Sequence, residues 1–196
     1  MIIPPFSASG VLPPYIDASP TVPAKRSPYA TDMFQLVERF CTSAHRATLL
    51  LGLNAYRKHL SEGGFVSGYQ WIDGSFVENV EDTRGRPPSD IDVVTLFNRP
   101  IKYQVSGDLW ESDYQATLHR NFFATQHMKP RYSCDTYSID LDADQASLVD
   151  HTMYWGGLFT DVKGSTEKKG IVRIPLSSDP MEFSAISNAI GGKFDV

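Results

Sequence analysis

Cysteine is scarce in this chain, and its scarcity disfavours two classes of protein. Only Cys41 and Cys134 occur among the 196 residues, without the paired spacing of a zinc site or a disulfide framework. A disulfide-stapled secreted domain and a zinc-finger domain are therefore not indicated. We expect both thiols to pack as small apolar groups in a reducing compartment, which predicts a cytoplasmic protein.

Long apolar runs and an excess of positive charge are also missing. The longest apolar stretch, ATLLLGLNAY, is far shorter than the roughly 20 residues that span a bilayer, so we expect no insertion into a membrane. The first residues, MIIPPFSASG, lack the basic and apolar regions of a secretory signal. The formal net charge of -5 disfavours a nucleic-acid-binding accessory protein, although the basic segment 163–173 leaves a local patch open. The five histidines show no metal or triad spacing.

The chain is long enough for one globular domain with a buried core, and its hydrophobic fraction of 41% is ordinary for that class. Residues 1–28 contain seven of the thirteen prolines, which predicts an extended arm along the domain or a loose leader instead of a helix. We expect the folded domain at 29–180 and a polar C-terminal tail at 181–196.

Apolar periodicity and turn residues predict helices and strands after the arm. Helical spacing begins at Thr31, and a second helix follows Thr42-Ser43 and ends at Gly63-Gly64. The other expected elements are strands at GYQWID, DIDVVTLF, 131–141 and GIVRIPL, and helices at 108–128 and 144–159. This order predicts an α+β fold, in which helices cover one face of a short mixed sheet.

Two aspartates stand in a segment that otherwise resembles a buried strand. Side chains two residues apart on a strand share a face, about 6–7 Å apart, so Asp90 and Asp92 form a crowded pair of carboxylates. Crowded, partly buried carboxylates repel each other, and a divalent cation removes that cost. Mg²⁺ prefers carboxylate and phosphate oxygens, with Mn²⁺ as an alternative. A third acid is expected from a neighbouring strand, and Asp135 is the first candidate, ahead of Asp140 and Asp142.

A Gly-Ser pair stands upstream of these acids, directly after the strand GYQWID. Gly74 allows a sharp turn and a close approach of the backbone to a ligand. Ser75 suits the start of a helix, where free N–H groups attract phosphate. A phosphate cradle facing a pair of metal-binding carboxylates is typical of phosphoryl or nucleotidyl transfer, in which two metal ions about 3.5–4 Å apart hold the entering and leaving oxygens.

The Gly-Ser turn followed by Asp-x-Asp on a strand resembles the signature of the polymerase-beta-like nucleotidyltransferase superfamily. More narrowly, GVLPPYI, WIDGSFVEN…SDIDVV and KGIVRI resemble a small family of bacterial nucleotidyltransferase-like proteins over residues 6–175. The resemblance implies that Gly74 and Ser75 bind the triphosphate and that Asp90, Asp92 and Asp135 are the catalytic residues and the ligands of two Mg²⁺ ions. The spacing between Ser75 and Asp90 is longer than usual, so 81–88 is interpreted as a loop insertion at the active-site rim.

The resemblance implies an Mg²⁺-dependent nucleotidyltransferase with a minimal polymerase-beta-like core. Such an enzyme transfers a nucleotide from an NTP or dNTP, such as ATP, to a hydroxyl of a nucleic acid or protein and releases pyrophosphate. Stand-alone bacterial members suggest a setting of antiviral (phage) defence or toxin–antitoxin pairs. The alternative is a non-catalytic nucleotide-binding module that regulates a partner, such as a toxin or a membrane effector. Base, sugar and acceptor stay open.

Three other features have two interpretations each. The aromatic segment 154–159 packs in the core or stacks on a base, with packing the more common outcome. Lys169 contacts a phosphate or is an exposed lysine without a role. Arg84 and Arg86, in the inserted loop, are candidates for contact with a nucleotide or a partner.

Overall fold

The computed structural model describes residues 3–17 and 19–194, which form a mixed five-stranded sheet in the order β1-β5-β2-β3-β4. The strands are β1 (Tyr29–Ala30), β2 (Gly68–Asp73), β3 (Ile91–Phe97), β4 (Cys134–Asp140) and β5 (Val172–Pro175). Strand β2 runs antiparallel to β3 and β5, whereas the β3–β4 and β1–β5 pairs are parallel. The predicted α+β class and mixed sheet are therefore confirmed, and β4 is an edge strand.

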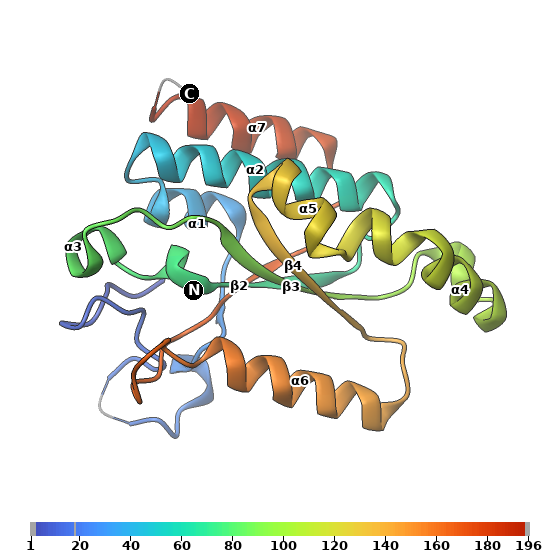
Figure 1. Cartoon of the computed structure of the whole chain (residues 1–196), viewed down its shortest axis with the longest axis horizontal. Coiled ribbons are helices and arrows are strands. Elements are labelled where there is room, and N and C mark those ends of the chain that lie inside the picture. Colours follow the sequence, from blue (N-terminus) through green and yellow to red (C-terminus); the bar gives the residue numbers. More distant parts are fainter. Residues whose placement is uncertain (1–2, 18, 195–196) are drawn as a thin grey trace.

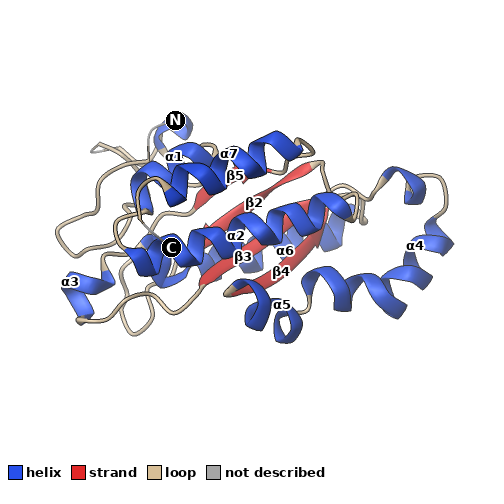
Figure 2. Ribbon diagram, turned by 90° about the horizontal axis from the view of Figure 1, so that it is seen from above, coloured by secondary structure: helices blue, strands red, loops and turns tan. Residues whose placement is uncertain are grey.

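One face of the sheet is covered by four helices, which lie above it in Figure 1 and over it in Figure 2. They are α1 (Met33–Phe40), α2 (Ala44–Glu62), α5 (Thr125–Tyr132) and α7 (Pro180–Gly191). Helix α2 begins where the Ser43 side chain caps it, accepting a hydrogen bond from the Arg46 N–H. Leu50, Leu53 and Leu60 recur at helical spacing on α2 and are fully buried in the main core beneath it.

The expectation that helices cover only one face was wrong. Helix α6 (Gln145–Phe159) lies against the opposite face (Figure 1). A second, smaller core lies there, in which Trp71, Val94 and Leu96 pack with Phe159 of α6. The reason is visible in β3, because Val93 and Val94 point to opposite faces and both are fully buried. A strand that is apolar on both faces needs cover on both sides.

Three segments differ from the elements expected from the sequence. The helix expected at 108–128 is divided into α4 (Gly107–Asp113), a π-helix (η4, Tyr114–Phe123) and the start of α5. The inserted loop contains a short helix, α3 (Val80–Arg84), which ends where Gly85 adopts a φ of 63°. Single-turn 3-10 helices occupy Pro23–Lys25 (η1), Gly74–Val77 (η2) and Ile101–Tyr103 (η3).

The expected polar tail at 181–196 is largely helical, because α7 extends to Gly191. Phe183, Ile186 and Ile190 are buried on one side of this helix, and the Asn54 side chain of α2 donates a hydrogen bond to the Phe183 carbonyl. The proline-rich arm packs along the domain, since the Leu12 carbonyl accepts a hydrogen bond from the Gly170 N–H. Over the described residues, no helix combines the length and the apolar character needed to cross a membrane.

Candidate functional site

Three aspartates form a row across the three strands β2, β3 and β4. Asp73 pairs with Asp92 in the antiparallel register, and Asp92 pairs with Asp135 in the parallel register. Residues paired across strands point to the same face of the sheet, and here it is the face that α6 covers. Asp90 precedes β3 by one residue, so the alternation of the strand directs it to the same side as Asp92. We call Asp73, Asp92, Asp135 and Asp90 the acidic row.

Asp92 lies at the centre of the row, and its environment opposes ionisation. Burial is the main cause that raises the pKa of Asp92 to about 6, and the charges of Asp90 and then Asp135 add to the shift. The predicted crowding of carboxylates is therefore present, with three acids acting on one another. A carboxyl group of this kind is typical of a site that receives a cation or an exchangeable proton.

The turn after β2 passes directly against Asp92. Gly74 adopts a φ of 81°, and a Cβ at this position would lie 1.8 Å from the Asp92 Oδ2 atom. Only glycine fits, so the turn and the acidic row are adjacent. Ser75 follows and is half-buried. The expectation that Ser75 starts a helix was only partly correct, because η2 is a single 3-10 turn of four residues and has little dipole to attract phosphate.

Lys129 of α5 supplies a positive charge inside the row. Its Nζ atom lies 2.7 Å from Asp90 Oδ2 and 2.6 Å from Asp135 Oδ2. Thr125, one turn earlier on α5, donates a hydrogen bond of 2.7 Å to the other oxygen of Asp135. Burial works to raise the pKa of Asp135, but the bonds from Lys129 and Thr125 outweigh it and lower that pKa. Asp135 is therefore an ionised carboxylate that accepts two hydrogen bonds.

Asp73 was missed from the sequence, and its partner Lys169 was interpreted differently. Lys169 is 3% exposed, and its Nζ atom lies 2.9 Å from Glu78 Oε1, 3.2 Å from Asp73 Oδ2 and 3.1 Å from the Gly74 carbonyl oxygen. Lys169 is therefore buried, and its contacts stabilise the Gly74 turn against the end of β2. Burial is the main cause that raises the pKa of Asp73 to about 7. The buried Asp73 Oδ1 has no hydrogen-bond partner among the described atoms.

One signal in the sequence pointed to Asp73. It stands directly before Gly74, at the end of a strand whose alternate position, Trp71, is buried on the same face. An acid at the end of a strand, directly before a glycine turn, is the only local pattern that marks Asp73. The partnership with Lys169 had no such signal, because the two residues lie far apart in the chain.

The other candidates for a third acid lie elsewhere. Asp140 is at the opposite end of β4, bonded to Arg99 Nε at 2.8 Å, and it points to the other face of the sheet from Asp135. The Asp142 carboxylate accepts a hydrogen bond of 2.7 Å from the Arg99 N–H. Both acids therefore stabilise the chain after β3 and β4. Among the described residues, Arg84 forms an ion pair of 2.7 Å with Glu78 and none with the acidic row.

A cavity of about 350 Å³ opens over the row on the α6 side. Its lining residues are Asp73, Asp92, Tyr137, Trp155, Leu158, Phe159, Asp161 and Lys163. The Trp155 and Tyr137 rings pack with their centroids 4.2 Å apart, and Phe159 is buried. The segment 154–159 thus serves both packing and the wall of the cavity. This combination of carboxylates, aromatic rings and one rim lysine has room for a small polar ligand.

The arrangement of the acids also bears on metal binding. In the described part of the chain, no three His, Cys, Asp or Glu side chains form a group that could hold a metal ion. Within the acidic row, the Lys129 ammonium contacts both Asp90 and Asp135 and offsets part of their negative charge. The donor atoms are all carboxylate oxygens, which suit Mg²⁺ or Mn²⁺, but a metal ion bound by both residues would have to replace this ammonium.

Together these features define an α+β domain with an acidic row at one end of its central strands and a glycine turn against it. The chain belongs to a family of unknown function (DUF6932), whose model matches residues 4–175. A search of curated proteins and a search of solved structures each found no significant match.

Proposed function

We propose that this protein is an Mg²⁺-dependent nucleotidyltransferase, which transfers a nucleotide from an NTP or dNTP to a hydroxyl group. The single observation that carries the proposal is the contact between the Gly74 turn and Asp92, with Asp135 in register beside it. The turn and the two acids come from different segments, and their meeting at one point supports a common ligand. The crowding that raises the pKa of Asp92 supports the same view.

The acidic row suits the proposed metal chemically. Asp90, Asp92 and Asp135 offer hard oxygen donors. The Lys129 side chain is 46% exposed, so its ammonium can move into solvent when a metal ion replaces it at Asp90 and Asp135. Bound Mg²⁺ would neutralise phosphate charge and hold the entering and leaving oxygens of the reaction. The turn at Gly74 and Ser75 would hold the phosphates through its backbone, since a side chain at position 74 is excluded.

In the proposed reaction Asp135 receives the proton of the acceptor hydroxyl. The hydrogen bond that Thr125 donates to Asp135 favours the ionised carboxylate, which can accept a hydrogen bond from the acceptor hydroxyl. The hydroxyl oxygen forms a bond with the α-phosphorus, the bond from the α-phosphorus to its bridging oxygen breaks, and pyrophosphate leaves. Trp155 and Tyr137, on the wall of the cavity over the row, would exclude water from this step.

A second candidate function is a regulatory module that binds a nucleotide and a partner protein without turnover. The observation that favours it is the pair of ion pairs that Lys129 forms with Asp90 and Asp135, which supply a positive charge to these acids without a metal ion. A site of this kind is stable without a metal ion. In that case the partner, such as a toxin or a membrane effector, would respond to nucleotide binding alone.

The experiment is incubation with each labelled NTP and dNTP and Mg²⁺, with Asp92→Asn beside the wild type. Pyrophosphate release by the wild type and its loss in Asp92→Asn support the enzyme. Asp142→Asn is the matched control, because Asp142 bonds the Arg99 N–H at the far end of the sheet. Nucleotide binding without pyrophosphate release from any protein would favour the regulatory module. Equal release from Asp92→Asn and the wild type would refute the assigned site.

A further inference from the structure

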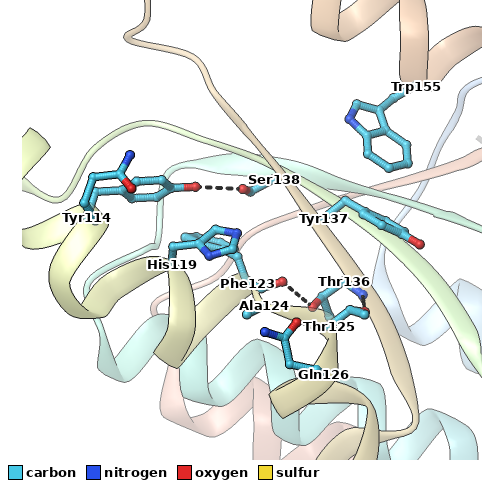
Figure 3. Close-up of a pocket in the computed structure, with 11 residues that line it drawn as sticks. Tyr114, His119, Phe123, Ala124, Thr125, Gln126, Thr136, Tyr137, Ser138 and Trp155 are labelled. Carbon is cyan, nitrogen blue, oxygen red and sulfur yellow. Dashed lines mark hydrogen bonds between the residues drawn. The ribbon is translucent and has the colours of Figure 1, made fainter.

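A second cavity, of about 570 Å³, lies beside the free edge of β4 (Figure 3). Its walls come from η4, the start of α5, strand β4 and Trp155 of α6. The lining residues are Tyr114, Gln115, His119, Phe123, Ala124, Thr125, Gln126, Thr136, Tyr137, Ser138 and Trp155. None of them is Lys, Arg, Asp or Glu, so the cavity differs in character from the charged acidic row. We call it the edge cavity.

The edge cavity adjoins the acidic row through shared residues. Tyr137 and Trp155 line both cavities, so the two spaces are neighbours that share this pair of rings. Thr125 lines the edge cavity and donates its hydroxyl hydrogen to Asp135. The edge cavity is therefore connected, through the Thr125 hydroxyl, to the carboxylate to which the proposed reaction assigns the proton.

Strand β4 offers backbone groups to this cavity. The Ile91 N–H bonds to the Ser133 carbonyl and the Leu141 N–H bonds to the Phe97 carbonyl, so odd-numbered residues of β4 bond to β3. Even-numbered residues consequently direct their N–H and C=O groups to the free edge. The Thr125 hydroxyl oxygen accepts a hydrogen bond of 2.8 Å from the Thr136 N–H. Ser138 presents an adjacent donor and acceptor there, and β4 ends the strand order of the described chain on this side.

The chemistry of the edge cavity selects a planar, uncharged ligand. An adjacent donor and acceptor on one residue match the edge of a nucleobase, and Gln115, His119 and Gln126 add further hydrogen-bonding groups. Trp155 and Tyr137 present ring faces of the kind on which bases stack. The absence of a lysine or arginine among the lining residues disfavours a phosphate group. The short edge available, with Thr136 already bonded, disfavours a peptide strand, which needs several successive backbone pairs.

We propose that the edge cavity binds a nucleoside, which serves as the hydroxyl acceptor. The assignment of a role as acceptor rests on the proposed nucleotidyltransferase function, whereas binding of the nucleoside does not. The base lies against Trp155 and Tyr137 and hydrogen-bonds to Ser138 and the Gln126 side chain, and the sugar hydroxyls point towards Thr125 and Asp135.

Trp155 provides a direct test of binding. Trp71 and Trp110 are 7% and 2% exposed, whereas Trp155 is half-buried, so a ligand that stacks on Trp155 quenches the accessible tryptophan fluorescence. Adenosine, guanosine, cytidine and uridine are titrated one by one in EDTA, without triphosphate. We expect saturable quenching by at least one of them, and about tenfold weaker binding in Gln126→Ala, since a hydrogen bond is lost. Gln145→Ala, an exposed glutamine on α6 outside the cavity, is the matched control.

Several outcomes would overturn the nucleoside proposal. One is the absence of quenching by every nucleoside at millimolar concentration, and another is equal affinity of Gln126→Ala and the wild type. A third is displacement of a bound nucleoside by a serine-containing peptide in the same titration, which would make a protein hydroxyl the occupant of the edge cavity. Failure of the enzyme proposal has a different signature. Nucleoside binding that depends on Gln126, without pyrophosphate release from any NTP or dNTP, supports the edge cavity and refutes turnover. Pyrophosphate release that Gln126→Ala leaves unchanged, with no nucleoside binding, refutes the edge cavity alone.

Discussion

Replacing Lys129 by methionine removes the ammonium group that lies 2.7 Å from Asp90 Oδ2 and 2.6 Å from Asp135 Oδ2. Methionine keeps most of the apolar length of the lysine side chain, so the change is mainly one of charge. The Lys129 side chain is 46% exposed, and solvent screening limits each of its two ion pairs to at most about 1 kcal/mol. We expect the free energy of unfolding in EDTA to fall by about 1–2 kcal/mol, because three acids are left without this cation.

The same change has the opposite effect on metal binding. A divalent ion at Asp90 and Asp135 no longer has to displace an ammonium, so the cost of about 1–2 kcal/mol disappears from its binding free energy. We expect the affinity for Mn²⁺ and Mg²⁺ to rise by about 5- to 30-fold in Lys129→Met. Isothermal titration calorimetry measures this affinity, and the difference in melting temperature between EDTA and Mn²⁺ gives a second measure.

Lys58→Met is the control for this experiment. Lys58 is an exposed lysine on α2, and its ion pair with Glu62 is 3.9 Å long. Metal affinity in this variant should equal that of the wild type. Unchanged or weaker metal binding in Lys129→Met would refute the assignment of Lys129 as the internal counter-ion, and so would an equal gain in Lys58→Met.

Three further predictions concern the turn and its support. Lys169→Met should lower the free energy of unfolding by about 3–5 kcal/mol near neutral pH, because Asp73 loses a buried cation; denaturant titration that finds no loss would contradict the ion-pair network. The pKa values of Asp73 and Asp92, raised by burial to about 7 and about 6, mean that the folded state holds these protons more tightly than the unfolded state. Their contribution to the free energy of unfolding is therefore present below about pH 4 and is lost as the pH rises to about 7. In urea titrations from pH 4 to 7.5, the free energy of unfolding should fall less in Asp92→Asn than in the wild type. Gly74→Ala should destabilise the fold by about 1–3 kcal/mol and abolish pyrophosphate release, because its Cβ would lie 1.8 Å from Asp92 Oδ2. Gly157→Ala is the control, since a Cβ there has no neighbouring atom within 4 Å, and it should change neither stability nor activity. A stable, active Gly74→Ala would refute the close contact between the turn and Asp92.

Local patterns were enough to locate most of the elements. The strands GYQWID and DIDVVTLF were expected where β2 and β3 occur, and the cap at Ser43 and the end at Gly63-Gly64 bound α2 as expected. Periodicity and capping act over a few residues, so they can be detected without the fold. The tail was misinterpreted because Phe183, Ile186 and Ile190 are few and widely spaced among polar residues, although their helical spacing is present in the sequence.

The residues of the candidate site also fall into those that local sequence patterns identify and those that only the fold brings together. Asp90, Asp92, Asp135 and the Gly74 turn were selected from the sequence, and the structure brings them together at one end of the sheet. Their role in catalysis and in metal binding stays a prediction. Asp73 was not selected, since its membership in the row depends on the register between β2 and β3.

By itself the sequence determined the class of the fold, the crowded carboxylates at the start of β3 and the need for glycine at position 74, because each follows from backbone sterics or strand alternation over a few residues. Only the tertiary structure decided which charges neutralise the acids. Lys129 and Lys169 come from segments far from Asp90 and Asp73 in the chain, and a lysine becomes an internal counter-ion only when packing carries it to a buried carboxylate. Pairing of this kind depends on the register of strands and the docking of helices, which no local pattern encodes.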